Sequence, residues 1–234
     1  MIDYLDKGKG GEVVVWLHGW AKGYSKEKYQ ELIDKLSEKY RVIALDFPGF
    51  GGSSLPPRPW GVDDYAESVA IFLKKMRVKE YVLAGHSFGG RVAIKMAVNK
   101  NNKIKKIILV DSAGIERKGM VVKLRLVLAK LVPEKLKAVI GGNLGAKDYR
   151  ETTGVMRESM KLVVEENLEK YLPKIKTSTL LVWGKNDGLT PLWQGKLMNR
   201  LIEGSKLVII PDANHRLPLD WVARLAKEMV EFIG

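Results

Sequence analysis

The sequence contains no cysteine, which excludes disulfides, thiolate metal sites and a cysteine nucleophile. It also lacks a long uncharged apolar run. The most apolar stretches, Met120 to Val132 and Leu207 to Ile210, are too short or too interrupted by Lys and Arg to span a bilayer. Residues 1–11 carry charges and no apolar stretch of the kind that a secretory signal has. These absences predict a cytoplasmic protein without a membrane span.

Acidic residues are fewer than basic ones, so positive charge is in excess. The 234 residues include 40 Lys and Arg against 27 Asp and Glu, a formal net charge of +13. Such an excess favours acidic partners, for example nucleic acid, an anionic membrane or an acidic protein. The basic residues are spread along the chain rather than gathered in a tail, and no nucleic-acid motif accompanies them. A Lys-rich solvated surface is the simpler interpretation, and we expect no nucleic-acid partner.

Short runs rich in β-branched residues alternate with longer amphipathic stretches, as in a parallel sheet covered by helices. The predicted strands are residues 12–17, 41–45, 81–84, 104–110, 179–183 and 206–210. The predicted helices are residues 26–39, 62–76, 88–99, 191–202 and 218–233. This alternation predicts an α/β fold with a mostly parallel, doubly wound sheet.

One segment interrupts the alternation. Residues 115–176 show helix-like patterns and no good strand, so we expect a helical cap inserted into a core formed by residues 1–114 and 177–234. Glycines divide the cap into two helical parts; they are Gly141, Gly142 and Gly145. Apolar residues of its first part are expected to line an acyl pocket; they are Met120, Val121, Val122, Leu124, Leu126, Val127, Leu128 and Leu131.

A candidate nucleophile lies in Gly85-His86-Ser87-Phe88-Gly89, which fits the pattern G-x-S-x-G. The motif follows a predicted strand and precedes a predicted helix. In that context a serine stands on a strained turn with its Oγ exposed. Glycines on both sides let the backbone fold tightly around the turn. Ser87 is therefore the predicted nucleophile.

A serine hydroxyl needs a base, and the sequence offers only three histidines, His18, His86 and His215. His86 adjoins Ser87, but neighbouring residues at a sharp turn point in different directions, so its predicted role is structural. His215 comes just after the last predicted strand, where a loop over the carboxyl edge of the sheet can bring it to Ser87. His215 is the predicted base.

The acid that orients the base should also follow a strand. Asp187 does so, in the loop after strand 179–183. An Asp before a Gly is common in ordinary turns, but the order Ser87, Asp187, His215 along the chain is that of one known type of catalytic triad. Asp111, which follows strand 104–110, stays the alternative acid.

Five motifs occur in a family order: HGW (18–20), DFPGFGGS (46–53), GHSFGG (85–90), WGKNDGLTP (183–191) and PDANH (211–215). With them the chain resembles the α/β-hydrolase superfamily along nearly its whole length. The resemblance implies an α/β-hydrolase fold and an oxyanion hole made by the backbone N–H groups of Trp20 and Phe88. Only about ten residues precede the first predicted strand, so we expect the usual first strands of the family to be short or missing.

A serine nucleophile forms an acyl-enzyme, so the expected substrate is an ester, thioester or similar activated acyl compound. Similar dehalogenases and epoxide hydrolases use Asp at this position, and their reactions are not expected. We expect a carboxylesterase that acts on small or medium acyl esters without a cofactor or metal. The alternatives are a thioesterase, a lactonase, an iminopeptidase-type peptidase, a carbon–carbon bond hydrolase of ring-cleavage products, and a non-catalytic ligand receptor or scaffold of the same fold.

The first part of the predicted cap is basic. Residues 116–137 hold seven Lys and Arg, among them Lys123 and Lys130, against two Glu. With residues 18–20 this pattern is similar to the carrier-protein methyl ester esterases of biotin synthesis, whose cap meets an acidic acyl carrier protein. Those enzymes carry a Trp before the nucleophile, where this chain has His86. The alternative is a solvated basic face with no protein partner.

Overall fold

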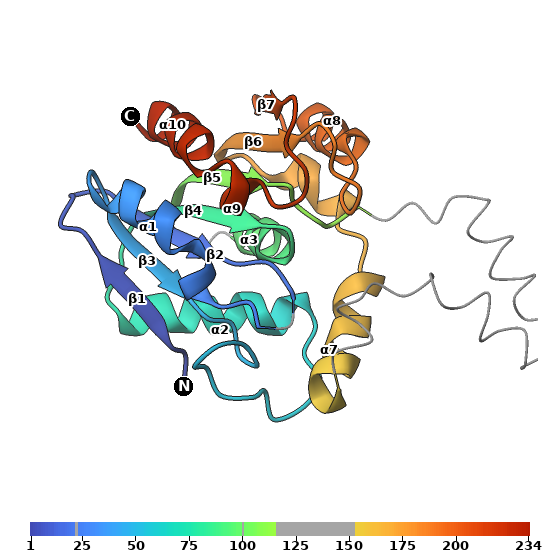
Figure 1. Cartoon of the computed structure of the whole chain (residues 1–234). Coiled ribbons are helices and arrows are strands. Elements are labelled where there is room, and N and C mark those ends of the chain that lie inside the picture. Colours follow the sequence, from blue (N-terminus) through green and yellow to red (C-terminus); the bar gives the residue numbers. More distant parts are fainter. Residues whose placement is uncertain (22, 100, 116–152) are drawn as a thin grey trace, which may run out of the picture.

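The structure, a computed structural model, describes residues 1–21, 23–99, 101–115 and 153–234. Its fold is built on one central sheet (Figure 1). Within these ranges the sheet has seven strands in the order β1-β3-β2-β4-β5-β6-β7. The strands are β1 (Tyr4–Lys7), β2 (Val13–Leu17), β3 (Arg41–Leu45), β4 (Tyr81–His86), β5 (Ile104–Val110), β6 (Ser178–Gly184) and β7 (Lys206–Ile210). β1 runs antiparallel to β3, and the other neighbours are parallel.

Helices cover both faces of the sheet (Figure 1). One face carries η1 (Lys26–Tyr29), α1 (Gln30–Ser37), α9 (Leu217–Asp220) and α10 (Val222–Ile233). The other carries α2 (Val62–Lys75), α3 (Phe88–Val98) and α8 (Leu192–Leu201). Parallel strands need such crossovers, because each strand must return to the same edge before the next begins. The carboxyl ends of the parallel strands therefore meet at one edge, where loops can combine their side chains.

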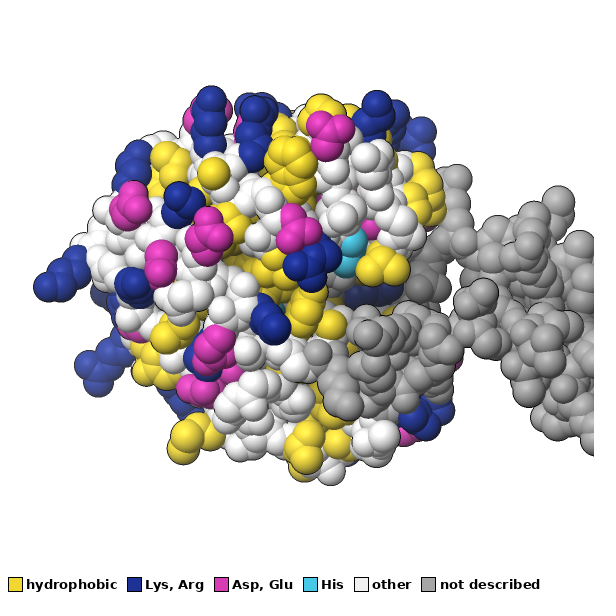
Figure 2. Space-filling model, in the orientation of Figure 1, with side chains coloured by type: hydrophobic (Ala, Val, Ile, Leu, Met, Phe, Trp, Pro, Cys, Tyr) yellow, Lys and Arg dark blue, Asp and Glu magenta, His cyan; other side chains and the backbone are white. Residues whose placement is uncertain are grey.

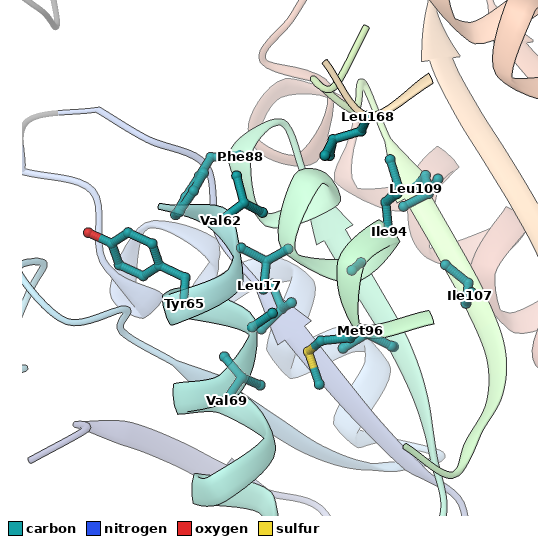
Figure 3. Packing of buried hydrophobic residues seen from close by; sticks show 14 of the residues in the cluster. Leu17, Val62, Tyr65, Val69, Phe88, Ile94, Met96, Ile107, Leu109 and Leu168 are labelled. Atoms are coloured by element: carbon teal, nitrogen blue, oxygen red, sulfur yellow. The ribbon is translucent and has the colours of Figure 1, made fainter. Parts of the chain in front are cut away.

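Each buried strand faces two apolar layers. In β2, Val14 and Trp16 pack on the α1 and α10 side, whereas Val15 and Leu17 pack on the α2 and α3 side. This follows from the two-residue period of a strand. Figure 3 shows the second layer, where Leu17 lies beside Val62, Tyr65 and other residues of α2 and α3. A strand apolar on both faces is the pattern from which the sequence predicted a parallel sheet.

The six predicted strands are confirmed to within two residues at each end, and the predicted fold class with them. β1 was not predicted as a strand. Its four residues are mostly exposed or half-buried and pair only with β3, so they carry no apolar period. This agrees with the expectation that the first strands are short. The predicted helix 218–233 is interrupted at Trp221, which has φ −126° and ψ 36° and separates α9 from α10.

Two helices of the predicted cap lie in the described ranges. These are α7 (Gly154–Glu165) and the 3-10 helix η3 (Glu169–Lys174), between β5 and β6. The buried Arg91 of α3 anchors α7, since its Nη1 donates to the carbonyls of Val163 and Glu166 at 2.9 and 2.8 Å. The predicted acyl-pocket residues, the glycine break and the basic residues from Arg117 to Lys137, Lys123 and Lys130 among them, lie outside the described residues.

Charged side chains are mixed on the surface. Figure 2 shows basic and acidic side chains interspersed over one face of the molecule, with apolar side chains between them. In the described ranges, no helix combines the length and the apolar character that crossing a membrane requires.

Candidate active site

Ser87 stands on the turn between β4 and α3, as the sequence predicts. Its backbone angles, φ 52° and ψ −108°, lie where residues other than glycine are strained. The turn is tight because glycines surround it. A Cβ on Gly85 would lie 2.4 Å from the carbonyl oxygen of Gly89, and one on Gly89 would lie 2.2 Å from that of Leu17. The glycines of the motif therefore permit α3 to pack directly against the ends of the strands.

Replacing Gly89 with alanine should destabilise the fold strongly. The new methyl group would meet backbone atoms of Leu17 and His18, which belong to the central sheet and its loop and cannot rotate away. We expect a loss of ~3 kcal/mol in the free energy of unfolding. Urea unfolding measures it, with Gly11→Ala as the control, since a Cβ on Gly11 has no atom within 4 Å. Equal stabilities of the two variants would contradict this account of the turn.

The three residues predicted as a triad lie in one hydrogen-bonded line. Nε2 of His215 is 3.0 Å from Oγ of Ser87, and Nδ1 of His215 is 2.7 Å from Oδ2 of Asp187. Asp187 follows β6 and His215 follows β7, so the two loops converge on the turn after β4. The carboxylate accepts the proton on Nδ1, which leaves Nε2 of a neutral ring free to take a proton from Ser87.

The carboxylate of Asp187 is held by groups of its own loop. Oδ1 accepts the backbone N–H groups of Leu189 and Thr190 at 2.7 and 2.8 Å, and Oδ2 is 2.6 Å from Oγ1 of Thr190. Burial alone would raise the pKa of Asp187, but the hydrogen bonds from His215 and Thr190 outweigh it, so the pKa lies below its usual value. Asp187 is therefore an oriented anion facing the imidazole.

Asp111, the alternative acid, lies close by but is bonded differently. It is fully buried after β5, and its Oδ1 accepts the backbone N–H of Gly184 at 2.8 Å. Oδ2 has no hydrogen-bond partner among the described residues. Burial raises the pKa of Asp111 to about 8; the charge of Asp187 acts in the same direction and the Gly184 amide opposes it. The two carboxyl groups therefore differ: Asp187 is ionised and Asp111 holds a proton at neutral pH.

This difference predicts how stability changes with pH in Asp111→Asn. A raised pKa means that the folded protein keeps a proton that the unfolded chain releases above about pH 4. Wild-type stability should therefore fall relative to the variant as the pH rises from about 4 to about 8. One such proton corresponds to at most about 1.4 kcal/mol per pH unit. Asparagine is neutral, keeps an oxygen for Gly184 and tolerates the positive φ of 42° at this position.

The measurement is urea unfolding of both proteins between pH 4 and pH 9. The difference in free energy of unfolding should grow in favour of Asp111→Asn up to about pH 8 and then level off. A difference that stays constant over this range would show that Asp111 is ionised in the folded protein.

The two predicted oxyanion donors lie beside the nucleophile. The rings of Trp20 and Phe88 meet edge to face at 5.0 Å, and Phe88 is the first residue of α3. In the part of the chain that the structure describes, neither backbone N–H donates to another protein group. Figure 3 shows Phe88 next to Tyr65 of α2, and their ring centroids are 5.0 Å apart. This aromatic packing holds Trp20 and Phe88 against each other at the start of α3, next to Ser87.

Gly19, which precedes Trp20, is held from two sides. Nδ1 of His18 lies 2.7 Å from the carbonyl oxygen of Gly19, and Nε2 of His18 accepts the N–H of Phe47 at 3.1 Å. The N–H of Gly19 donates to the hydroxyl of Tyr29 at 3.2 Å. Since C=O and N–H of a trans peptide point in opposite directions, fixing the carbonyl of Gly19 also fixes the N–H of Trp20. Burial lowers the pKa of His18 to about 4 and keeps its ring neutral.

Sequence reasoning did not identify the supporting residues Thr190 and Tyr29. Thr190 lies in the WGKNDGLTP motif, three residues after Asp187, and a hydroxyl at that spacing could have indicated a hydrogen bond to the Asp187 carboxylate. Tyr29 lies in an ordinary amphipathic helix pattern and gave none. We assign no metal to the grouping of His86, Asp111 and His215, because both histidines are already engaged in hydrogen bonds to protein groups.

Comparisons with known proteins agree with this architecture. Residues 12–153 match the family model of the alpha/beta hydrolase fold. The chain is similar to the uncharacterized hydrolase YugF of Bacillus subtilis, with 24% identity over 96% of this chain and 90% of the relative. It is also similar to the 2-hydroxy-6-oxo-6-(2'-aminophenyl)hexa-2,4-dienoic acid hydrolase of Metapseudomonas resinovorans, with 27% identity over 99% of this chain and 87% of that enzyme.

Among solved structures, an esterase from Exiguobacterium antarcticum superposes with a TM-score of 0.78 at 24% identity, covering 99% of this chain and 95% of the esterase. That likeness concerns the fold. The family match covers more than half of the sequence and includes the strand, turn and helix around Ser87. The chain belongs to the α/β-hydrolase fold family.

Proposed function

We propose that the protein is a serine hydrolase that cleaves carboxylic esters through an acyl-enzyme, with Ser87 as nucleophile, His215 as base and Asp187 as orienting acid. The observation that carries the proposal is the continuous line from Ser87 Oγ through the His215 ring to Asp187, with contacts of 3.0 and 2.7 Å. A neutral imidazole within hydrogen-bond distance of a strained serine is the arrangement that nucleophilic catalysis requires.

The reaction follows from these contacts. Oγ of Ser87 attacks the ester carbonyl carbon while Nε2 of His215 takes the hydroxyl proton. The carbonyl oxygen becomes an oxyanion that accepts hydrogen bonds from the N–H groups of Trp20 and Phe88. The C–O bond then breaks, and the imidazolium gives its proton to the leaving alcohol. A water molecule, which gives a proton to His215, then attacks the carbonyl carbon of the acyl-enzyme. The bond to Oγ breaks, the acid leaves, and His215 returns the proton to Ser87.

A carbon–carbon bond hydrolase is the second candidate. The observation that favours it is the 27% identity, over nearly the whole chain, to the dienoic acid hydrolase of Metapseudomonas resinovorans. The Exiguobacterium neighbour is an esterase, which supports the first candidate at the level of a shared fold. Both reactions place an oxyanion beside the nucleophile, so the triad alone does not separate them and the substrate must be tested directly.

The cap is part of the proposal. We propose that residues 115–176 form it, on the support of α7 and η3, which lie between β5 and β6 and are anchored through Arg91. The acyl-carrier partner that the basic segment suggested is not included. Its residues lie outside the described ranges, and none of the three relatives reported above is named for such a substrate.

The test is a substrate panel. Initial rates are measured for p-nitrophenyl esters of rising acyl length, for lactones and for a 2-hydroxy-6-oxo-dienoate ring-cleavage product, with Ser87→Ala protein as the blank. The proposal expects the highest kcat/KM on an ester of small or medium acyl length. A higher kcat/KM on the ring-cleavage product would support the second candidate. No serine-dependent turnover of any substrate would indicate the non-catalytic alternative.

A further inference from the structure

A buried chain of hydrogen bonds joins the oxyanion loop to the loop of the base, and the reaction above does not use it. The N–H of Gly19 lies 3.2 Å from the hydroxyl of Tyr29, which lies 3.1 Å from Nδ1 of His86. Nε2 of His86 lies 2.9 Å from the carbonyl oxygen of His215. Tyr29 and His86 are each 1% exposed, so no solvent replaces these partners. The chain crosses from the residue before Trp20 to the base itself.

Each proton in this series of hydrogen bonds can be assigned to a donor atom. The carbonyl of His215 can only accept, so Nε2 of His86 must carry the proton. Nδ1 of the neutral ring is then an acceptor and receives the hydroxyl proton of Tyr29. The oxygen of Tyr29 keeps a lone pair for the N–H of Gly19. Burial lowers the pKa of His86 to about 3, so the ring stays neutral at pH values well above 3 and this arrangement is kept there.

The geometry at Gly19 connects this series of hydrogen bonds to the candidate active site. A Cβ built on Gly19 would lie 3.0 Å from Nδ1 of His86 and 3.5 Å from Cβ of Ser87, so the loop approaches the nucleophile closely. The carbonyl of Gly19 is fixed by His18 and its N–H by Tyr29. Without the hydroxyl of Tyr29, the peptide between His18 and Gly19 loses its restraint. The orientation of the next peptide, which carries the Trp20 N–H, then depends on the contact of His18 with the Gly19 carbonyl alone.

We propose that Tyr29 and His86 are positioning residues that form one hydrogen-bonded bridge, which holds the Trp20 oxyanion donor and the base His215 at a fixed separation across Ser87. The catalytic part of this inference rests on the proposed function, whereas the bridge itself does not. Neither residue touches the reacting atoms. Their contribution is rigidity: an oxyanion donor stabilises the transition state only if it is already aimed when the charge develops.

The test is Tyr29→Phe, which removes the hydroxyl and keeps the ring against Trp16. The matched control is Tyr40→Phe. Tyr40 is equally buried in the same apolar layer, and its hydroxyl contacts the carbonyls of Val230 and Gly234, away from the site. Circular dichroism first checks that both variants are folded at the assay temperature.

For Tyr29→Phe we expect kcat on a p-nitrophenyl ester to fall about 10- to 100-fold with KM within about threefold, because only transition-state stabilisation is lost. The inhibition constant of an alkyl trifluoromethyl ketone, which forms an oxyanion on Ser87, should rise by the same factor. Tyr40→Phe should change neither quantity by more than about twofold. Combining Tyr29→Phe with His86→Leu should lower kcat by less than the product of the two single effects, since the two residues share one hydrogen bond of the bridge.

A second readout does not depend on turnover. Amide hydrogen exchange measured by NMR should be at least about tenfold faster at Gly19 in Tyr29→Phe and unchanged in Tyr40→Phe. Unchanged exchange at Gly19, or equal kinetic losses in the two tyrosine variants, would overturn the inference. If the wild type hydrolyses no ester, the proposed function fails by itself, and the exchange at Gly19 still decides whether the bridge exists.

Discussion

Ser87→Ala should lower kcat/KM for ester hydrolysis by about five powers of ten while the protein stays folded. The hydroxyl supplies the atom that forms the acyl bond, and no other described side chain is in line with Nε2 of His215. Its loss removes covalent catalysis altogether. What remains is the contribution of the oxyanion donors and of substrate binding. Steady-state rates, corrected for spontaneous hydrolysis of the ester, measure the effect.

Ser112→Ala is the matched control. Ser112 is buried after β5 and lies against Gly90 of α3; among the described residues its hydroxyl donates a hydrogen bond to the carbonyl of Ala113. This substitution should leave kcat/KM within about threefold of the wild type. If Ser87→Ala kept more than about a tenth of wild-type activity, another residue would be the nucleophile.

Asp187→Asn should lower kcat by about three to four powers of ten, for a reason specific to this loop. Oδ1 of Asp187 accepts two backbone N–H groups, so the single oxygen of an asparagine must stay there. The amide nitrogen then takes the place of Oδ2 and donates to Nδ1 of His215. That bond selects the tautomer with a proton on Nε2, which cannot accept the proton of Ser87.

Asp111→Asn provides the comparison, because both carboxyl groups are buried near His215. Asp111 is bonded to Gly184 and holds a proton, so the neutral amide replaces it with little change in charge. We expect kcat within about tenfold of the wild type. A larger loss in Asp111→Asn than in Asp187→Asn would move the role of acid to Asp111.

Much of the fold could be predicted because its signals are local. The strands β2 to β6 are apolar on both faces, and only a strand covered by helices on each side tolerates such a run. The proximity of the three residues of the proposed triad could be predicted for a related reason. Parallel strands all end at one edge, so Ser87, Asp187 and His215, each placed after a strand, had to lie near one another.

The rest depends on contacts that no local pattern encodes. Tyr29 reads as one more apolar residue of an amphipathic helix, and only the packed structure brings its hydroxyl between Gly19 and His86. The two contacts of His86, with the hydroxyl of Tyr29 and with the carbonyl of His215, are likewise visible only in the packed structure. Strand β1 escaped prediction because an exposed edge strand needs no apolar alternation. The break at Trp221 escaped it because the residues of α9 and α10 continue one apolar face.

The central claim, that Ser87 is a nucleophile activated by His215, is tested most directly by covalent labelling. The wild type, Ser87→Ala and His215→Ala proteins are treated with a fluorophosphonate, and the adduct is located by mass spectrometry of the digested protein. The account predicts one adduct per wild-type chain, on Ser87, none in Ser87→Ala, and labelling of His215→Ala slower by at least about a thousandfold. Wild-type protein that stays unlabelled, or that is labelled on another residue, would contradict it.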